Sequence, residues 1–261
     1  MIRFRRSLFL IVGALLLMAP TGAWALTGAE ILDQVAQKGI GEGGFRISLQ
    51  VETTKGKKKL KDHTIWLMGR VKPDETSFFI DIEAPADSRG TRFLFKVRSG
   101  QKPEVYMYTP ATGKTTQLNQ RNPLVELGRT GLTMEEILAL APQGDETATL
   151  AKEEVVEGLP SYVIRIASPG QPGERLIWVA KNDFFVLKSQ QVDAGGKVSK
   201  SFRVVEFFKT EQGRTFPRAE EILMPDKGLR IKVRQESAVF GIEIPDEVLN
   251  PQTFGAFRWR T

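Results

Sequence analysis

Apolar and charged residues alternate with a period of two along most of the chain after its first forty residues. In the clearest example, Leu229, Ile231 and Val233 alternate with three cations, Arg230, Lys232 and Arg234. Successive side chains of a strand point to opposite faces of a sheet, so this pattern predicts strands with one apolar and one wet face. The chain is therefore predicted to be mainly β.

Glycine, proline and aspartate interrupt the alternating runs at regular intervals and favour tight reversals of the chain. Consecutive strands are therefore expected to pair as antiparallel hairpins in one long meander of about eleven strands, some of the shorter runs merging. The runs begin near Phe45, Thr64, Thr76, Thr91, Glu104, Lys114, Thr147, Ser161, Arg175, Phe184, Val198, Thr215 and Gly228.

Two short helices are predicted within this β pattern. Each opens with a threonine and a glutamate three residues later, the spacing of a capping box. The first begins at Thr27 and ends at Gly39. The second covers residues 133–141, and its one apolar face carries Met134, Ile137 and Leu138. A third helical turn is expected at residues 246–250.

Residues 1–25 have the pattern of a secretory signal peptide. Three arginines precede an apolar run that is short for a membrane span, and Ala23-Trp24-Ala25 forms a small-residue cleavage site. The chain has no cysteine, which excludes disulfides, a thiolate metal site and a lipid-modified cysteine. We therefore expect a soluble periplasmic protein without a lipid anchor, whose residues 26–261 form a single domain.

Charge and motif content exclude several classes of function. Removing the signal lowers the net charge from +6 to +3, which is too weak and too dispersed for a nucleic-acid interface. His63 is the only histidine, and the sequence has no Gly-x-Ser-x-Gly motif, phosphate loop or metal-ligand spacing. Adjacent carboxylates such as Glu220-Glu221 point in divergent directions and do not form an acid and base pair. No enzymatic activity, cofactor or metal is expected.

A sheet with one apolar face and few helices must close, pair with another sheet or hold a ligand. At this point the sequence resembles the LolA-like family of outer-membrane lipoprotein-sorting proteins, from Ile82 to the C-terminus. The resemblance lies in the order of these segments: Pro85 with Arg89-Gly90-Thr91 and Phe93-Leu94, Tyr106 with Tyr108-Thr109-Pro110, Gly113-Lys114, Leu132-Thr133, Trp178-Val179-Ala180-Lys181, Phe185-Val186-Leu187-Lys188, Asp193, Gly196-Lys197, Phe216-Pro217 and Ile244-Pro245-Asp246.

The resemblance implies an incomplete antiparallel β-barrel around an apolar cavity, with a few short helices as lid or plug. It implies a carrier that binds acyl chains of lipoproteins or free lipid and shuttles them toward the outer membrane, between an inner-membrane transporter and an outer-membrane acceptor. Arg89 is the nearest match to a gating arginine. The expected cavity and lid residues are Phe78, Ile80, Phe93, Phe95, Met134, Ile137, Leu138, Ile164, Trp178, Leu229, Ile231 and Val233.

Two alternatives remain open. A sensor or adaptor domain of the same fold would bind lipidated ligands and signal to a membrane protein partner. Its candidate partner surfaces are the cationic rows Arg92, Lys96, Arg98 and Arg230, Lys232, Arg234. A hydrolase is the third reading, and the missing nucleophile motifs argue against it.

Overall fold

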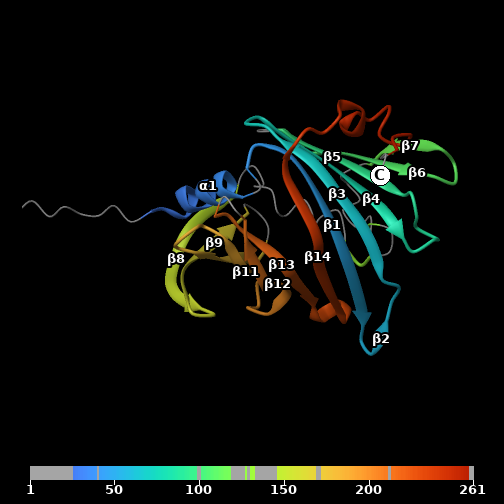
Figure 1. Cartoon of the computed structure of the whole chain (residues 1–261). Helices are drawn as coiled ribbons and strands as arrows, with labels where there is room; N and C mark the ends of the chain where they lie inside the picture. Colours follow the sequence, from blue (N-terminus) through green and yellow to red (C-terminus); the bar gives the residue numbers. More distant parts are fainter. Residues whose placement is uncertain are drawn as a thin grey trace, which may run out of the picture.

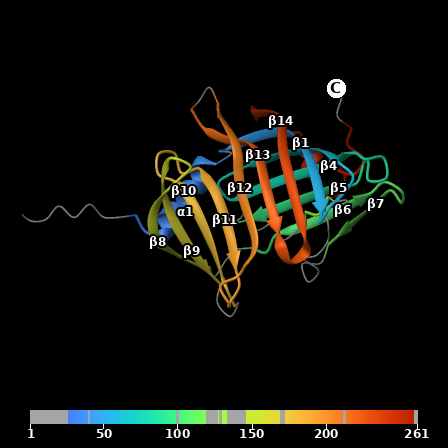
Figure 2. The same ribbon diagram turned by 90° about the horizontal axis from the view of Figure 1, so that it is seen from below.

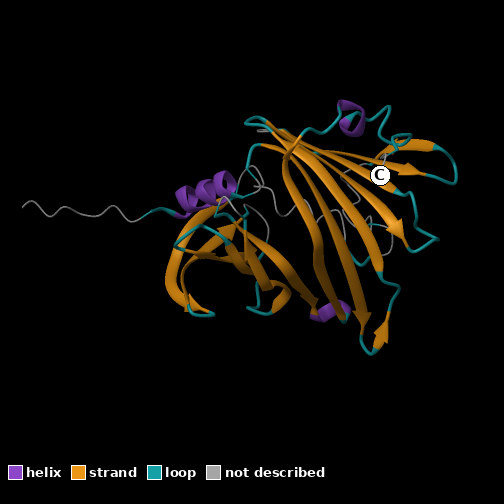
Figure 3. Cartoon of the chain, viewed as in Figure 1, coloured by secondary structure: helices purple, strands orange, loops and turns teal. Residues whose placement is uncertain are grey.

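The computed structural model describes residues 26–39, 41–98, 101–118, 127, 130–132, 146–168, 172–210 and 213–258. These residues form helix α1 (Gly28–Lys38), 3₁₀ helices η1 (Pro225–Lys227) and η2 (Asp246–Leu249), and strands β1 (Gly43–Lys55), β2 (Lys58–Lys59), β3 (His63–Val71), β4 (Glu75–Ala84), β5 (Arg92–Arg98), β6 (Glu104–Thr109), β7 (Lys114–Gln117), β8 (Thr147–Val156), β9 (Leu159–Ala167), β10 (Glu174–Ala180), β11 (Val186–Val192), β12 (Val198–Lys209), β13 (Thr215–Met224) and β14 (Leu229–Ile242). Strands dominate the molecule (Figure 3).

The strands form one antiparallel sheet in the order β7-β6-β5-β4-β3-β1-β14-β13-β12-β11-β10-β9-β8, with β2 paired to β1. The sheet is strongly curved and does not close, because β7 and β8 form its two edges (Figures 1 and 2). The predicted fold class, a mainly β incomplete barrel with few helices, is confirmed. Curvature gives the sheet an inner and an outer face.

The pairing of β1 with β14 joins the two halves of the sheet. These long strands lie side by side at its centre (Figure 1), and Val51 of β1 faces Val233 of β14. All other neighbours along the sheet are consecutive strands of the meander, apart from the short β2. The fold therefore depends on one long-range strand pairing between the beginning and the end of the described chain.

The strand positions agree closely with the predicted ones, but the count is larger. Within the described residues the sheet has 14 strands, where we expected about eleven. No predicted run merged with its neighbour, because a turn with a suitable glycine or a polar loop separates each pair. The additional strand β2 contains only Lys58 and Lys59, which is too short to show a period.

The predicted first helix is present with its capping box. The Thr27 side chain accepts a hydrogen bond from the Glu30 backbone N–H at 3.2 Å, and the Thr27 N–H donates to the Glu30 carboxylate at 2.7 Å. Ile31 is fully buried against strands β9 and β10, where Ile164 and Val179 belong to the same cluster. α1 thus covers part of the sheet near the β8 edge (Figure 1).

The outer face of β3–β6 is covered by the C-terminal segment. Phe79 and Leu94 of this face are fully buried against Val248 and Phe254, and the rings of Phe79 and Phe254 meet edge to face. The Arg92 guanidinium fixes the segment, because its Nη1 lies 2.7–3.2 Å from three backbone carbonyl oxygens within residues 254–257. The segment gives these four strands a second core outside the barrel.

Candidate functional site

The inner face of the sheet is continuous across both halves. Residues that pair across neighbouring strands lie on the same face, so one row of partners can be followed from strand to strand. This row runs through Thr53, Ile231, Ile222, Phe202, Ser189, Ile177, Ile164 and Leu150. The apolar clusters around Ile231 and Ile164 therefore belong to one concave surface.

The half formed by β1, β3–β6 and β14 presents its largest apolar groups on this inner face. Phe78 and Phe95 stack with ring centroids 4.6 Å apart, and both belong to the cluster that contains Ile231. Gly69 on β3 has no side chain because a Cβ there would lie 2.6 Å from the Phe45 ring and 2.6 Å from the Ser77 carbonyl oxygen. The aromatic side chains can therefore lie flat against the strands.

Residues between β7 and β8 cover part of this face. Leu127 and Thr130 are buried, and the Thr53 hydroxyl donates a 2.5 Å hydrogen bond to the Thr130 carbonyl. A Cβ on Gly131 would lie 3.2 Å from the Ile231 side chain, which shows how closely this connection approaches β14. The apolar inner face is consequently a packed surface here, with Phe95 and Ile231 fully buried.

Most of the predicted cavity residues come together on the inner face. They are Phe78, Ile80, Phe93, Phe95, Leu229, Ile231 and Val233 in the first half of the sheet and Ile164 in the second. The predicted lid residues Met134, Ile137 and Leu138, and the signal peptide, lie outside the described residues. The inner-face prediction depends only on the period of two, which is why residues far apart in sequence converge.

Trp178 is the exception among the predicted cavity residues. Ile177 and Val179 both point to the inner face, so the alternation of β10 places Trp178 on the outer one. There its indole N–H donates to the Glu154 carboxylate, and the Lys188 ammonium lies 4.1 Å from its ring centroid. Our expectation is therefore corrected. Trp178 is buried by its polar neighbours on the outer surface.

Arg89, the candidate gating residue, lies in the turn between β4 and β5. Its side chain is exposed, and its Nε–H donates a 2.8 Å hydrogen bond to the Glu83 carbonyl oxygen. This contact fixes the turn at the end of β4. The structure thus gives Arg89 a local contact outside the apolar cluster.

Glu220 is a polar residue on the inner face that the sequence reading passed over. It pairs with Val204 on one side and with Val233 on the other, and both valines are buried. Burial alone raises the pKa of Glu220 from 4.5 to about 7. The signal was present in the sequence, because Glu220, Ile222 and Met224 alternate on one face of β13.

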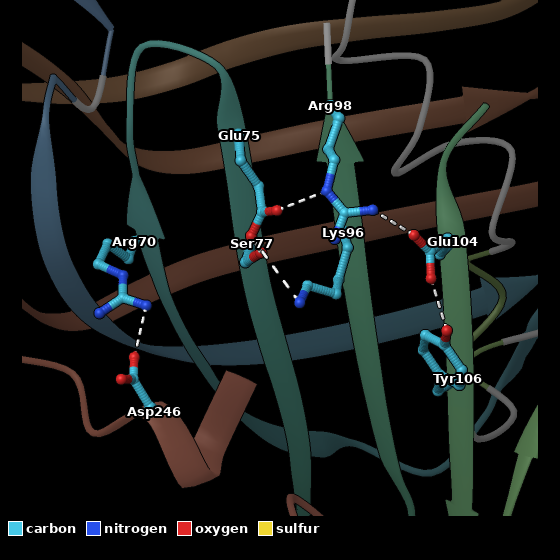
Figure 4. Close-up of polar contacts among 8 residues, drawn as sticks. All are labelled: Arg70, Glu75, Ser77, Lys96, Arg98, Glu104, Tyr106 and Asp246. Atoms are coloured by element: carbon cyan, nitrogen blue, oxygen red, sulfur yellow. Dashed lines mark hydrogen bonds and ion pairs between the residues drawn. The ribbon is translucent and has the colours of Figure 1, made fainter. Parts of the chain in front are cut away.

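A polar cluster occupies the outer face at the end of β3–β6 (Figure 4). Arg98 bridges Glu75 at 2.7 Å and Glu104 at 2.5 Å, and Arg70 binds Asp246 of η2 at 2.7 Å. A hydrogen bond from the Tyr106 hydroxyl, with the Arg98 guanidinium, holds the pKa of Glu104 below its usual value. The carboxylates of this cluster are paired with its arginines, and the Arg70–Asp246 pair attaches η2 to β3.

The two cationic rows differ in their surroundings. Arg92, Lys96 and Arg98 are held by carboxylates or backbone carbonyls of the same chain. The β14 row, Arg230, Lys232 and Arg234, lies on the outer face and is exposed. Arg230 and Arg234 contact Glu221 and Glu206 at 3.5 and 3.2 Å. Only the β14 row is available to a partner.

The described residues contain no group of three or more side chains that could hold a metal ion. No helix in these parts of the chain is both long and apolar enough to span a membrane. Two surface hollows, of about 340 Å³ beside η2 and about 460 Å³ between α1 and Phe184, are lined mainly by charged and amide side chains.

Comparisons with known proteins agree with this architecture. Residues 74–255 match the model of a family of uncharacterized proteins. A search of curated proteins finds no match. Among solved structures, a DUF1329 family protein from Desulfovibrio piger superposes with a TM-score of 0.77 at 17% identity, over 85% of this chain and 95% of its own.

Two further solved structures carry names from lipoprotein sorting. A domain from Vibrio parahaemolyticus named for outer membrane lipoprotein sorting gives a TM-score of 0.77 at 15% identity, over 87% of this chain and 98% of its own. A LolA superfamily protein from Nitrosomonas europaea gives 0.66 at 16% identity, with the same coverage. The family model covers residues 74–255, so the chain belongs to that family of uncharacterized proteins, and its fold is similar to that of the DUF1329 and LolA superfamily structures.

Proposed function

We propose that the protein is a periplasmic carrier whose residues 26–261 form one lipid-binding domain. The observation that supports this proposal is the continuous inner face of an open sheet, lined from β5 to β9 by residues such as Phe93, Ile231 and Ile164. Burying an acyl chain on such a surface stabilises the complex by about 0.8 kcal/mol per methylene group. The cargo would be a lipoprotein or a free lipid.

Loading requires that the inner face becomes accessible. Leu127 and Thr130 cover the half around Ile231, and Ile31 of α1 packs on Ile164 in the other half. An acyl chain would have to displace one of these segments or enter beside it. Residues 133–141, which begin directly after the covering segment, remain our candidate for a lid. An inner-membrane transporter as donor and an outer-membrane acceptor would complete the route.

Two neighbouring residues on β13 provide a matched test. Ile222 lies on the inner face and Leu223 on the outer face, and both are half-buried. The measurement is the fluorescence of an acyl-chain probe titrated with each protein. We expect Ile222→Asn to weaken probe binding severalfold and Leu223→Asn to leave it near wild type. Equal effects of the two substitutions, or no binding by the wild-type protein, would contradict the carrier.

The adaptor alternative would use the exposed row on β14. Arg230, Lys232 and Arg234 could attract an acidic surface of a membrane protein while the inner face holds a lipidated ligand. The substitution Lys232→Glu distinguishes the carrier from the adaptor. A carrier keeps its acyl-probe binding and its transfer of lipid, whereas an adaptor keeps probe binding but loses capture of its membrane partner.

A further inference from the structure

Glu220 is an ionisable residue on the inner face of β13. No hydrogen bond or ion pair reaches its carboxylate from the part of the chain that the structure describes, and burial is the only influence on its pKa. Its neighbours in the cross-strand row, Val204 and Val233, are apolar and cannot replace lost hydration. Glu220 is half-buried, so its carboxylate lies at the surface of the inner face and is only partly hydrated there.

Glu220 lies on the part of the inner face where apolar side chains give way to polar ones. Toward β14 the inner residues are Ile231 and Val233, whereas the inner face of β11 carries Ser189 and Gln191, which pair with Phe202 and Lys200 of β12. Ser189 is half-buried and Gln191 is exposed. Glu220 therefore lies between an apolar region that suits acyl chains and a polar region that suits the rest of a lipid.

From this arrangement we infer that Glu220 binds the polar end of the ligand through a hydrogen-bond donor, and that the preferred ligand is a lipid with a primary amine next to its acyl chains. This inference rests on the proposed carrier function and specifies its substrate class. An ammonium group supplies both a positive charge and N–H donors to the carboxylate. A quaternary ammonium supplies the charge without a donor and binds less well.

Packing alone does not require a carboxylate at this position. Leucine would pack against Val204 and Val233 without the penalty of an unpaired polar group. The neighbouring Glu221 shows the contrast, because it faces the outer surface and is bridged by Arg203 at 2.8 Å and Arg230 at 3.5 Å. Glu221 has its partners within the chain, and Glu220 would find its partner in the ligand.

The test compares two probe lipids with identical acyl chains, phosphatidylethanolamine and phosphatidylcholine, taken up from vesicles and quantified by native mass spectrometry. We expect the wild-type protein to prefer the ethanolamine lipid on the order of tenfold, the effect of one charge-assisted hydrogen bond. Glu220→Leu should bind both lipids equally. The matched control, Glu52→Leu on the exposed outer face of β1, should keep the preference.

The outcomes separate this inference from the carrier proposal. Uptake of both lipids without preference by the wild-type protein overturns the role of Glu220 and leaves the carrier intact. Uptake of neither lipid contradicts both. Because a leucine could alter the fold, Glu220→Gln serves as a second variant of the same shape, and it should reduce the preference while retaining the wild-type circular dichroism. An unchanged preference in Glu220→Gln and Glu220→Leu also overturns the inference.

Discussion

Glu220 and Glu221 are consecutive residues that lie on opposite faces of β13 and in opposite electrostatic surroundings. Glu221 is bridged by two arginines on the outer face, whereas Glu220 faces the inner surface between two valines. Within the part of the chain that the structure describes, only Glu221 of these two carboxylates is ion-paired. The period of two thus places Glu220 on the surface that we assign to the ligand.

The raised pKa of Glu220 predicts a specific pH dependence of stability. Its carboxyl has a pKa of about 7 in the folded protein and an ordinary value of 4.5. Between these values the unfolded chain loses its proton first, so the free energy of unfolding falls as pH rises, by up to about 3 kcal/mol. Below pH 4.5 both states are protonated and the contribution is constant.

Glu220→Gln removes this titration. The difference in unfolding free energy between wild type and variant, measured with urea from pH 4 to pH 8, should shift in favour of the variant across that window. Parallel pH profiles of the two proteins would show that Glu220 titrates normally.

Arg92 should be a major contributor to stability. It pairs with Asp81 at 3.2 Å and donates to three carbonyls of the C-terminal segment. Arg92→Gln leaves Asp81 and these carbonyls without the guanidinium and should destabilise the fold by about 2–4 kcal/mol. Hydrogen exchange in residues 243–257 should rise. Arg89→Gln, which removes one exposed contact, should change stability by less than about 1 kcal/mol. Similar losses in both variants would refute this assignment.

Gly69→Ala should disturb the packing of the aromatic inner face. The added methyl would meet the Phe45 ring and the Ser77 carbonyl, and the carbonyl belongs to a neighbouring strand and cannot move aside. We expect a loss of about 1–3 kcal/mol in thermal or urea unfolding. Gly195→Ala, in a turn where the nearest neighbour of an added methyl is the Asp193 Oδ1 at 3.3 Å, is the control. Stability equal to wild type in Gly69→Ala would mean that the strands can separate there.

Locking the segment that covers the inner face should block loading. The chain has no cysteine, so Thr53→Cys with Thr130→Cys places the protein's two thiols on the two segments that the Thr53–Thr130 hydrogen bond joins. We expect the oxidised double variant to lose acyl-probe uptake and to regain it after reduction. The single variant Thr130→Cys should bind the probe in both conditions. Full uptake by the oxidised protein, with the disulfide verified by mass, would show that this segment need not move.

The sequence predicted the strands and their faces well, since both depend on local alternation. Phe95 and Ile231 converge on one surface because each lies on the apolar side of its own strand. What local pattern cannot supply is the pairing of β1 with β14, which joins residues nearly 200 positions apart, or the covering of Phe79 by Phe254. Trp178 shows the second limit, because it was expected at the cavity and the alternation of β10 places it on the outer face.

The central claim is that the inner face holds an acyl chain in the working protein. The most direct measurement is mass spectrometry of the organic-solvent extract of the full chain, purified from its own cell envelope without added lipid. The account predicts close to one lipid or lipopeptide per protein molecule, with a marked reduction in Ile222→Asn. A protein that yields no lipid from the wild-type chain, at a detection limit well below one molecule per chain, would contradict it.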